Sequence, residues 1–241
     1  MTPAISDQLG VLAQQREQLD VERRRIQKAY CLAVLDHITA KVRHACPEAA
    51  YVGVAYNGTT RDVDLLGVLG EQTSPLSGLP WLWESSDEEH PLAEIAADIE
   101  ADVQTALKPY DSPAWATIRA NRASDGNLWL VELPPVDRAA RIAQLVRESH
   151  PQATAVVVDG RGVGGRVIEV VEGVDEDGAP IRLRPRWTGE CDDVLNRLVA
   201  QIFAIPDLAD RHLVHAQDRY RHRWWSGTRD LAWVMPLPPA E

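Results

Sequence analysis

The fold is decided by one short sequence that occurs twice in the chain. Residues 128–135 read LWLVELPP and residues 232–239 read AWVMPLPP, an offset of 104 residues. A short apolar run that carries a tryptophan and is bounded by prolines is typical of a strand. Two prolines then end the strand, because proline has no N–H to donate to the sheet. Each occurrence therefore predicts the closing strand of a small structural unit.

Three further sets of residues keep the same offset. They are V-R-x-x-x-P at 42–47 and 146–151, V-x-V at 52–54 and 156–158, and the tryptophans Trp83 and Trp187. Residues 64–75 match 169–180 at an offset of 105, which requires one small gap. A repeat of this length predicts duplication of a whole unit. The alternative of two unrelated units with similar endings stays open.

The repeat predicts an α+β fold. We expect two tandem copies of a small two-layer α/β unit, at 32–135 and 136–241, with helices on one face of a mostly antiparallel sheet. In each copy a helix ends near His44 or Glu148, and strands follow at 50–56 or 154–159 and at 63–69 or 167–171. A third, shorter strand leads toward Trp83 or Trp187, a second helix follows, and the tryptophan strand closes the copy. Ser85 and Ser86, three residues before Glu88 and Glu89, predict the start of the second helix in the first copy by a capping box.

A long N-terminal helix is predicted over residues 5 to about 44, and residues 1–31 form a helical arm ahead of the first copy. Ile5, Leu12, Leu19, Ile26 and Ala33 recur every seven residues, as one seam of a coiled coil does. The companion seam is poor, because Leu9 and Tyr30 flank Arg16 and Arg23. The pattern leaves two alternatives open: a homodimer through this helix, or a helix that lies on its own unit.

Composition limits the partners that the protein can have. The net charge is −11, which argues against a general affinity for nucleic acid or for anionic membranes. No apolar run is long enough to cross a membrane, and no secretory signal is visible. Cys31, Cys46 and Cys191 are odd in number and widely spaced, which favours reduced thiols in a cytoplasmic protein. Arginine outnumbers lysine 22 to 3, a bias that fits a GC-rich bacterial coding sequence.

Asp62 and Asp64 are the weak candidates for a catalytic metal-binding pair. Alternate residues of a strand share a face, so both carboxylates could bind one divalent cation, as in phosphoryl-transfer enzymes. Nucleotidyltransferase-like enzymes also need a Gly-Ser turn before the pair and a third carboxylate on a later strand, and this sequence offers neither. A solvated strand face explains the pair as well, so no metal or cofactor is predicted.

Two other stretches resemble sites only superficially. Residues 159–165 read DGRGVGG, but a phosphate-binding loop needs a helix directly after it, and the residues that follow are β-branched and predict a strand. Residues 84–90 gather four carboxylates and His90, a run that helix capping explains better than a metal site. We therefore predict a hairpin turn at the first stretch and a helix start at the second.

The most unusual composition lies at residues 211–229, which we call the basic-aromatic strip. It holds five arginines, three histidines, one tyrosine and two adjacent tryptophans. Such side chains dominate protein-protein hot spots, and they also stack on bases. The candidate partner-binding residues are Arg219, Tyr220, Arg221, Arg223, Trp224 and Trp225. A structural role is the remaining alternative, with a tryptophan in the core and the arginines paired to the protein's own carboxylates.

Three classes of function follow from these observations. The sequence favours a non-catalytic protein-interaction or adaptor protein over an enzyme, because duplication of a module enlarges a surface without requiring a catalytic constellation. A metal-dependent hydrolase or phosphotransferase that uses Asp62 and Asp64 is the first alternative. A nucleic-acid binder that uses the basic-aromatic strip is the second.

Overall fold

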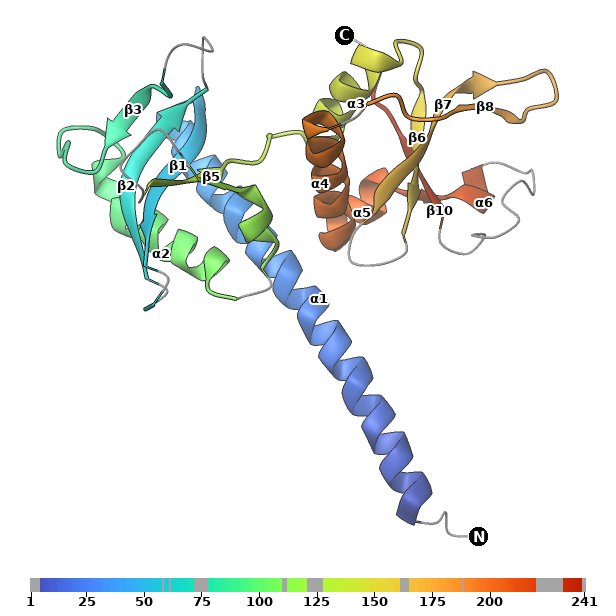
Figure 1. The fold of residues 1–241 in the computed structure, drawn as a ribbon, viewed down its shortest axis with the longest axis horizontal. Coiled ribbons are helices and arrows are strands. Elements are labelled where there is room, and N and C mark those ends of the chain that lie inside the picture. Colours follow the sequence, from blue (N-terminus) through green and yellow to red (C-terminus); the bar gives the residue numbers. More distant parts are fainter. Residues whose placement is uncertain are drawn as a thin grey trace. The chain divides into compact units, whose positions relative to one another are not determined.

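The chain forms two compact units, Met1–Leu133 and Pro134–Glu241, in the computed structural model. The structure describes residues 5–57, 59–60, 62–71, 78–109, 112–120, 128–160, 165–187, 189–219 and 232–239. The prediction of an α+β fold with a long N-terminal helix is confirmed, and each unit contains one five-stranded antiparallel sheet (Figure 1). Among the described helices, none has the length and apolarity that a bilayer span requires.

The first unit places its first and last strands side by side in the middle of the sheet. Its elements are α1 (Ile5–Ala45), β1 (Ala49–Tyr56), β2 (Val63–Gly70), β3 (Trp81–Glu84), η1 (Ala93–Ile95), α2 (Ala96–Leu107), η2 (Pro113–Thr117), β4 (Ile118–Ala120) and β5 (Leu128–Glu132). The strand order is β3-β2-β1-β5-β4. The C-terminal part of α1 packs against α2, and α2 packs on β2.

The second unit has the corresponding strand order, β8-β7-β6-β10-β9. Its elements are α3 (Arg138–Ser149), β6 (Ala155–Asp159), β7 (Arg166–Val174), β8 (Pro180–Leu183), α4 (Glu190–Ala204), α5 (Pro206–His212), β9 (Val214–His215), α6 (Ala216–Arg219) and β10 (Ala232–Pro236). The strand β7 begins one residue after Gly165, so a strand follows the glycine-rich stretch as the sequence predicts. Residues 161–164 of that stretch lie outside the described part of the chain.

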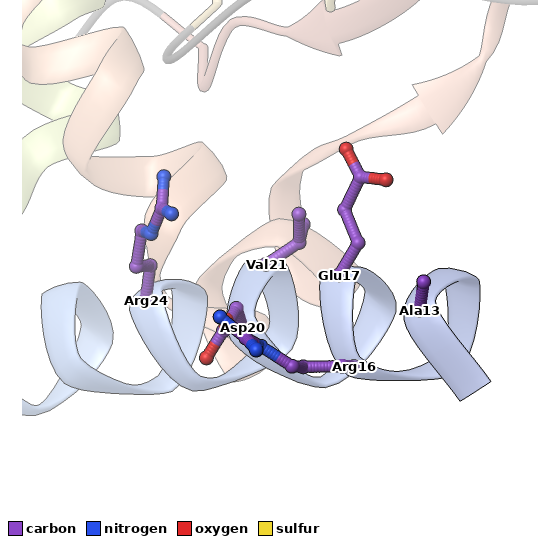
Figure 2. Close-up of a pocket in the computed structure, with 6 residues that line it drawn as sticks. All are labelled: Ala13, Arg16, Glu17, Asp20, Val21 and Arg24. Carbon is purple, nitrogen blue, oxygen red and sulfur yellow. The ribbon is translucent and has the colours of Figure 1, made fainter. Parts of the chain in front are cut away.

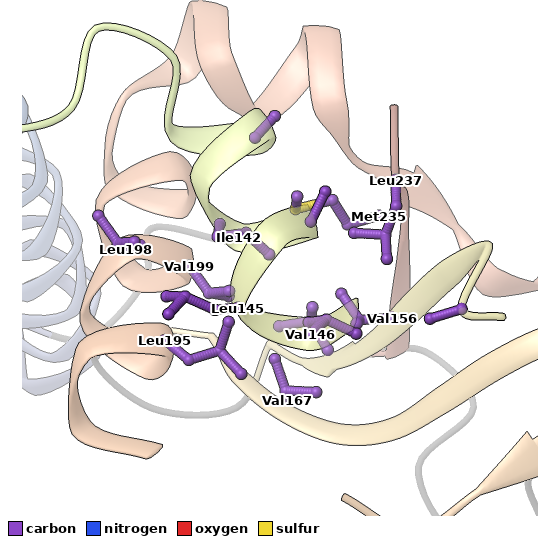
Figure 3. Close-up of a cluster of buried hydrophobic side chains, with 14 of the residues drawn as sticks. Ile142, Leu145, Val146, Val156, Val167, Leu195, Leu198, Val199, Met235 and Leu237 are labelled. Carbon is purple, nitrogen blue, oxygen red and sulfur yellow. The ribbon is translucent and has the colours of Figure 1, made fainter. Parts of the chain in front are cut away.

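Both faces of the second sheet are buried. Helices α3 and α4 cover one face, where Ile142, Leu195 and Ile202 are fully buried against strand residues such as Val156 (Figure 3). The opposite face forms a smaller cluster around Val157 and Val234, to which α6 contributes Ala216. Because side chains alternate along a strand, the V-x-V sequence places Val156 and Val158 on the helix-covered face and Val157 on the other.

Hydrogen bonds at the end of the first helix recur in the second unit at the offset seen in the sequence. The N–H of Cys46 donates to the carbonyl of Val42, and the N–H of His150 donates to that of Val146. The N–H of Leu133 donates to Ala50, and that of Leu237 donates to Thr154. Trp129 lies opposite Val54 in its sheet, and Trp233 lies opposite Val158.

Two arginines tie the helix end to the closing segment. Arg43 donates through Nε to the carbonyl of Ala49 at 3.1 Å and through Nη2 to that of Leu133 at 3.5 Å. Arg147 donates to the carbonyl of Pro238 at 2.6 Å. Burial lowers the pKa of the Arg43 guanidinium, and the charge of Glu71 opposes this shift. The repeated V-R-x-x-x-P and Leu-Pro-Pro sequences therefore contact each other within each unit.

The predicted start of the second helix is wrong in the first unit. Helix α2 begins at Ala96, behind a short 3-10 turn, and its first turn has no side-chain cap. Ser85 and Ser86 lie in a turn directly after β3. The polar residues that suggested a cap hold this turn instead, since Asp87 Oδ1 accepts the N–H of Glu89 and the carbonyl of Asp87 accepts the indole N–H of Trp83.

Candidate functional site

Asp62 and Asp64 are exposed at the start of β2, and the described part of the chain gives them no third ligand. Asp64 lies on β2 and Asp62 directly precedes it. Within the described ranges, no group of three or more His, Cys, Asp or Glu side chains is placed to hold a metal ion. The two carboxylates therefore remain an unsupported candidate for metal-dependent chemistry.

Side chains of α2 bind the backbone N–H groups on either side of Asp64. The N–H of Val63 donates to Gln104 Oε1 and that of Leu65 donates to Glu100 Oε2, each at 2.8 Å. Strand β3 pairs with β2 only at residues 67–69, so the two side chains substitute for strand partners at the open part of this edge. In the second unit, Asn196 accepts the N–H of Val167 in the same way.

A thiol and an imidazole that are distant in sequence meet in the first unit. Cys46 Sγ lies 3.8 Å from His90 Nε2, and the His90 ring lies 6.2 Å from the Trp83 ring between centroids. Cys46 is 5% exposed. The sequence does not predict this pair, because the two residues are 44 positions apart and His90 lies in a run that resembles a helix cap.

The hydrogen bonds of His90 oppose a nucleophilic role for Cys46. The N–H of Leu92 donates to His90 Nδ1 at 3.1 Å, so the neutral ring carries its proton on Nε2, the nitrogen that faces the sulfur. A general base would need that nitrogen free. Burial, assisted by the charge of Glu48, raises the pKa of the Cys46 thiol, which keeps it protonated. This pair stabilises the fold rather than activating a thiolate.

His150 lies in the second unit at the position that corresponds to Cys46 in the first. It is 2% exposed, its ring packs edge-on against Trp187 at 5.5 Å, and Nε2 has no hydrogen-bond partner within the described part of the chain. Trp187 itself donates to Asp192 Oδ1 at 3.1 Å, an atom that also accepts from Asn196. Burial, reinforced by the positive charge of Arg186, lowers the pKa of His150, although Glu172 opposes the shift.

We expect His150 to make the second unit sensitive to acid. The folded state holds the imidazole neutral, whereas the unfolded chain binds a proton once the pH falls below about 6.5. The contribution of His150 to the free energy of unfolding should therefore be constant above this pH. It should fall as the pH drops toward the lowered folded-state pKa. Denaturant titrations of the wild type and of His150→Phe between neutral pH and pH 5 measure this difference. A decline that is equally steep in both proteins would contradict the assignment.

The side of the first sheet that faces away from Val52 and Val54 carries an exposed aromatic surface, which we call the Trp81 face. Trp81 on β3 is 41% exposed. A Cβ atom added to Gly53 or Gly67 would lie 3.2 or 3.0 Å from the Trp81 ring, so the indole rests across β1 and β2 where those strands carry glycine. Glycine inside a strand often marks such a close approach, so Gly53 and Gly67 are the sequence signal for this surface.

Acidic residues border the Trp81 face. Glu84 pairs with Gly67, and Asp64 pairs with Ala55, so both carboxylates lie on the same side of the sheet as the indole. Glu84 and Asp64 are exposed, and Leu128 beside Gly53 is half-buried. The face therefore combines an apolar centre with negative charge at its margin.

No family model, curated protein or solved structure matches this chain.

The basic-aromatic strip is described only in its first half. Arg211 and His212 end α5, and Arg219 is exposed at the end of α6. His215 belongs to the fold, because β9 pairs with β10 and the His215 ring lies 4.6 Å from the Trp233 ring between centroids. Five of the candidate residues, Tyr220, Arg221, Arg223, Trp224 and Trp225, lie outside the described residues.

A shallow hollow lies along the N-terminal part of α1. Its lining residues are Ala13, Arg16, Glu17, Asp20, Val21 and Arg24 (Figure 2). All six come from one helix, and four of them, Ala13, Glu17, Val21 and Arg24, extend from the same side of it. A hollow with this lining offers no converging set of polar groups, so we assign no small-molecule ligand to it.

Proposed function

We propose that this protein is a non-catalytic protein-interaction protein built from two copies of one α+β module. The observation that carries the proposal is the Trp81 face, where a large aromatic side chain lies partly exposed across two strands that carry glycine. Partly exposed tryptophans are typical of interface hot spots, because they bury a large area on binding and lose little conformational entropy.

The duplication is supported by contacts that repeat together with the sequence. Arg43 and Arg147 bind the closing segments of their units, and the hydrogen bonds of Cys46 and Leu133 correspond to those of His150 and Leu237. Two unrelated units would share an ending in the sequence without sharing these partners. The two modules differ on the face away from the helices, since Val157 stands where the first module has Gly53 beneath Trp81.

Charge indicates which partner each surface would prefer. The acidic margin of the Trp81 face favours a segment that combines basic and apolar residues. The basic-aromatic strip favours an acidic protein surface. A nucleic acid is disfavoured, because a body of charge −11 repels a polyanion that approaches within a Debye length, about 8 Å at physiological salt, and Asp210, Asp218 and Asp230 dilute the strip.

Partner binding should depend on one of these two surfaces. A partner captured by the wild type is identified, purified and titrated against Trp81→Ala and against the triple variant Arg219→Ala/Arg221→Ala/Arg223→Ala. We expect at least one variant to weaken binding by about tenfold or more, which corresponds to about 1.4 kcal/mol, because truncated hot spots cost this much. The arginine variant should leave the melting temperature nearly unchanged.

Matched variants control this experiment. Ile181→Ala removes an apolar side chain on β8 that is 46% exposed, and Arg184→Ala removes an exposed arginine outside the strip. Both should bind the partner as the wild type does. Micromolar binding of single-stranded DNA or RNA at about 0.15 M salt that the triple variant loses would favour the nucleic-acid alternative instead. A rise in melting temperature with Mg²⁺ or Mn²⁺ that requires Asp62 and Asp64 would favour the metal-dependent enzyme.

A further inference from the structure

The N-terminal part of α1 exposes apolar side chains over a long stretch. Every residue from Gln8 to Gln27 is exposed apart from the half-buried Asp20, and the first buried residue of the helix is Cys31. Seven large apolar side chains in this part are at least 55% exposed: Leu9, Val11, Leu12, Leu19, Val21, Ile26 and Tyr30. Figure 1 shows this part of α1 extending beyond its own sheet.

Local interactions give this part of the helix little stability. Asp20 pairs with Arg23 at 3.2 Å and Glu22 pairs with Arg25 at 2.8 Å, both across one turn. Exposed pairs of this kind contribute little to helix stability, because water and salt screen them. Most of the stability of a protein helix comes from packing of an apolar face, so an unpacked stretch of this length lacks its main source of stability.

The exposed apolar residues are not spread evenly around the helix. At about 100° per residue, Leu9, Leu12, Leu19, Ile26 and Tyr30 fall within an arc of about 100°, which is the width of a packing face. We call this arc the α1 seam. Arg16 and Arg23 lie within the same arc, whereas Val11 and Val21 lie well outside it. The α1 seam is thus an apolar stripe interrupted by two charges, and the charges restrict its partner.

We propose that the α1 seam binds the same helix of a second copy of this protein in antiparallel orientation, with the twofold axis between Glu17 and Gln18. This register places Leu9 opposite Ile26 of the second copy, and Tyr30 opposite Ile5. The inference goes beyond the proposed function, because it concerns the protein's own assembly and holds whether or not a further partner exists.

The positions of the arginines determine the orientation. A parallel pair in register would stack Arg16 on Arg16 and Arg23 on Arg23 in the interface, which like charges oppose. The antiparallel pair sets Arg16 opposite Leu19 and Arg23 opposite Leu12. Each guanidinium then extends to solvent along an aliphatic stem. The antiparallel pair also brings Glu22 of the second copy within about one turn of Arg16, where the opposite charges attract.

The antiparallel register fixes the distance between the two folded bodies. Cys31 of one copy lies 27 residues along the paired helices from Cys31 of the other, because the axis is midway between residues 4 and 31. At about 1.5 Å per residue, the two bodies begin about 40 Å apart. A parallel pair would instead place them side by side, so this distance distinguishes the two arrangements.

Paired variants test the α1 seam in the full-length protein. Leu12→Asp/Leu19→Asp places two charges in the seam, and we expect it to convert a dimer into a folded monomer in light scattering. Val11→Asp/Val21→Asp is the matched control, because its side chains are exposed to a similar extent, 56% and 60% against 59% and 71%, but lie off the seam. A wild type that is monomeric at tens of micromolar, or a control that also loses the dimer, would overturn the proposal.

Spin labels test the orientation. Single cysteines at Gln15→Cys and Gln8→Cys, both at the edge of the α1 seam, are labelled in a Cys191→Ser background, since Cys31 and Cys46 are buried. Antiparallel pairing predicts a short distance between the two copies at position 15, where the axial separation is about 8 Å, and an axial separation of about 28 Å at position 8. Short distances at both positions would indicate a parallel dimer and would refute the register.

Discussion

Replacing Gly67 by alanine should destabilise the first unit by about 3 kcal/mol or more. Gly67 has a φ of 151°, a conformation that residues with a side chain rarely adopt, so any substitution costs about 1–3 kcal/mol in backbone strain. The new methyl group would also overlap the backbone carbonyl oxygen of Trp83, with the Glu84 Cα at 3.0 Å. Overpacking of this kind adds about 1–3 kcal/mol, because β3 must move away from β2.

Calorimetry measures the loss, and a second glycine provides the control. A change of this size should lower the melting temperature of the first unit by more than about 10 °C. Gly10→Ala should be neutral or slightly stabilising, because Gly10 lies in α1 with no atom within 4 Å of an added Cβ. Equal melting temperatures for Gly67→Ala and the wild type would show that β2 and β3 do not pair as described.

Replacing Leu195 by alanine should destabilise the second unit by about 2–5 kcal/mol. Leu195 is fully buried where α4 packs on α3 and the sheet, so its removal leaves a cavity in addition to the lost transfer energy. We expect chemical denaturation followed by hydrogen exchange to show the loss in amides of α3, α4 and β6, while amides of β1 and β5 keep their protection. Val136→Ala, at a position that is 87% exposed, should change stability by less than about 0.5 kcal/mol. Equal loss of protection in both units would contradict this localised response.

The long, periodic elements could be predicted from the sequence. Helix α1 runs from Ile5 to Ala45, close to the predicted 5–44, and β1 and β2 begin and end within one residue of their predicted bounds. Their patterns of apolar residues are set by their own packing faces, which the sequence carries directly. The relation of the two units as copies remains a prediction, although their strand orders correspond.

The short elements could not be predicted, because tertiary partners define them. Strand β4 has three residues and β9 has two, and each exists through pairing with the closing strand of its sheet. The start of α2 was misplaced because Ser85 and Ser86 carry a capping pattern that serves a turn. A capping pattern specifies local hydrogen bonds and does not determine whether a helix follows them.

The chemistry of the candidate sites could not be predicted from the sequence for a similar reason, because it depends on contacts that only the fold creates. Cys46 and His90 are 44 residues apart in the sequence and in contact in the fold. Only the hydrogen bond from Leu92 shows that the His90 ring carries its proton on Nε2, the nitrogen that a general base would need free. Asp64 could be placed on a strand from sequence alone, although Asp62 directly precedes that strand. The contacts of Gln104 and Glu100 with the N–H groups on either side of Asp64 could not be predicted, because α2 lies about 40 residues further along the chain.

The central position of the closing strand has a consequence for how each unit matures during synthesis. Strand β1 is among the first parts of its unit to leave the ribosome, yet one of its two neighbours, β5, is the last. Until Leu128–Glu132 emerges, the β5 side of β1 is an unpaired edge, and such edges attract wrong partners. The hydrogen bond from Arg43 to the carbonyl of Leu133 can form only after this segment has emerged. A nascent chain that pauses before Leu128–Glu132 has left the ribosome should therefore be more prone to aggregation than one that pauses just after the Pro-Pro sequence has emerged, when the first unit can close before translation of the second is complete.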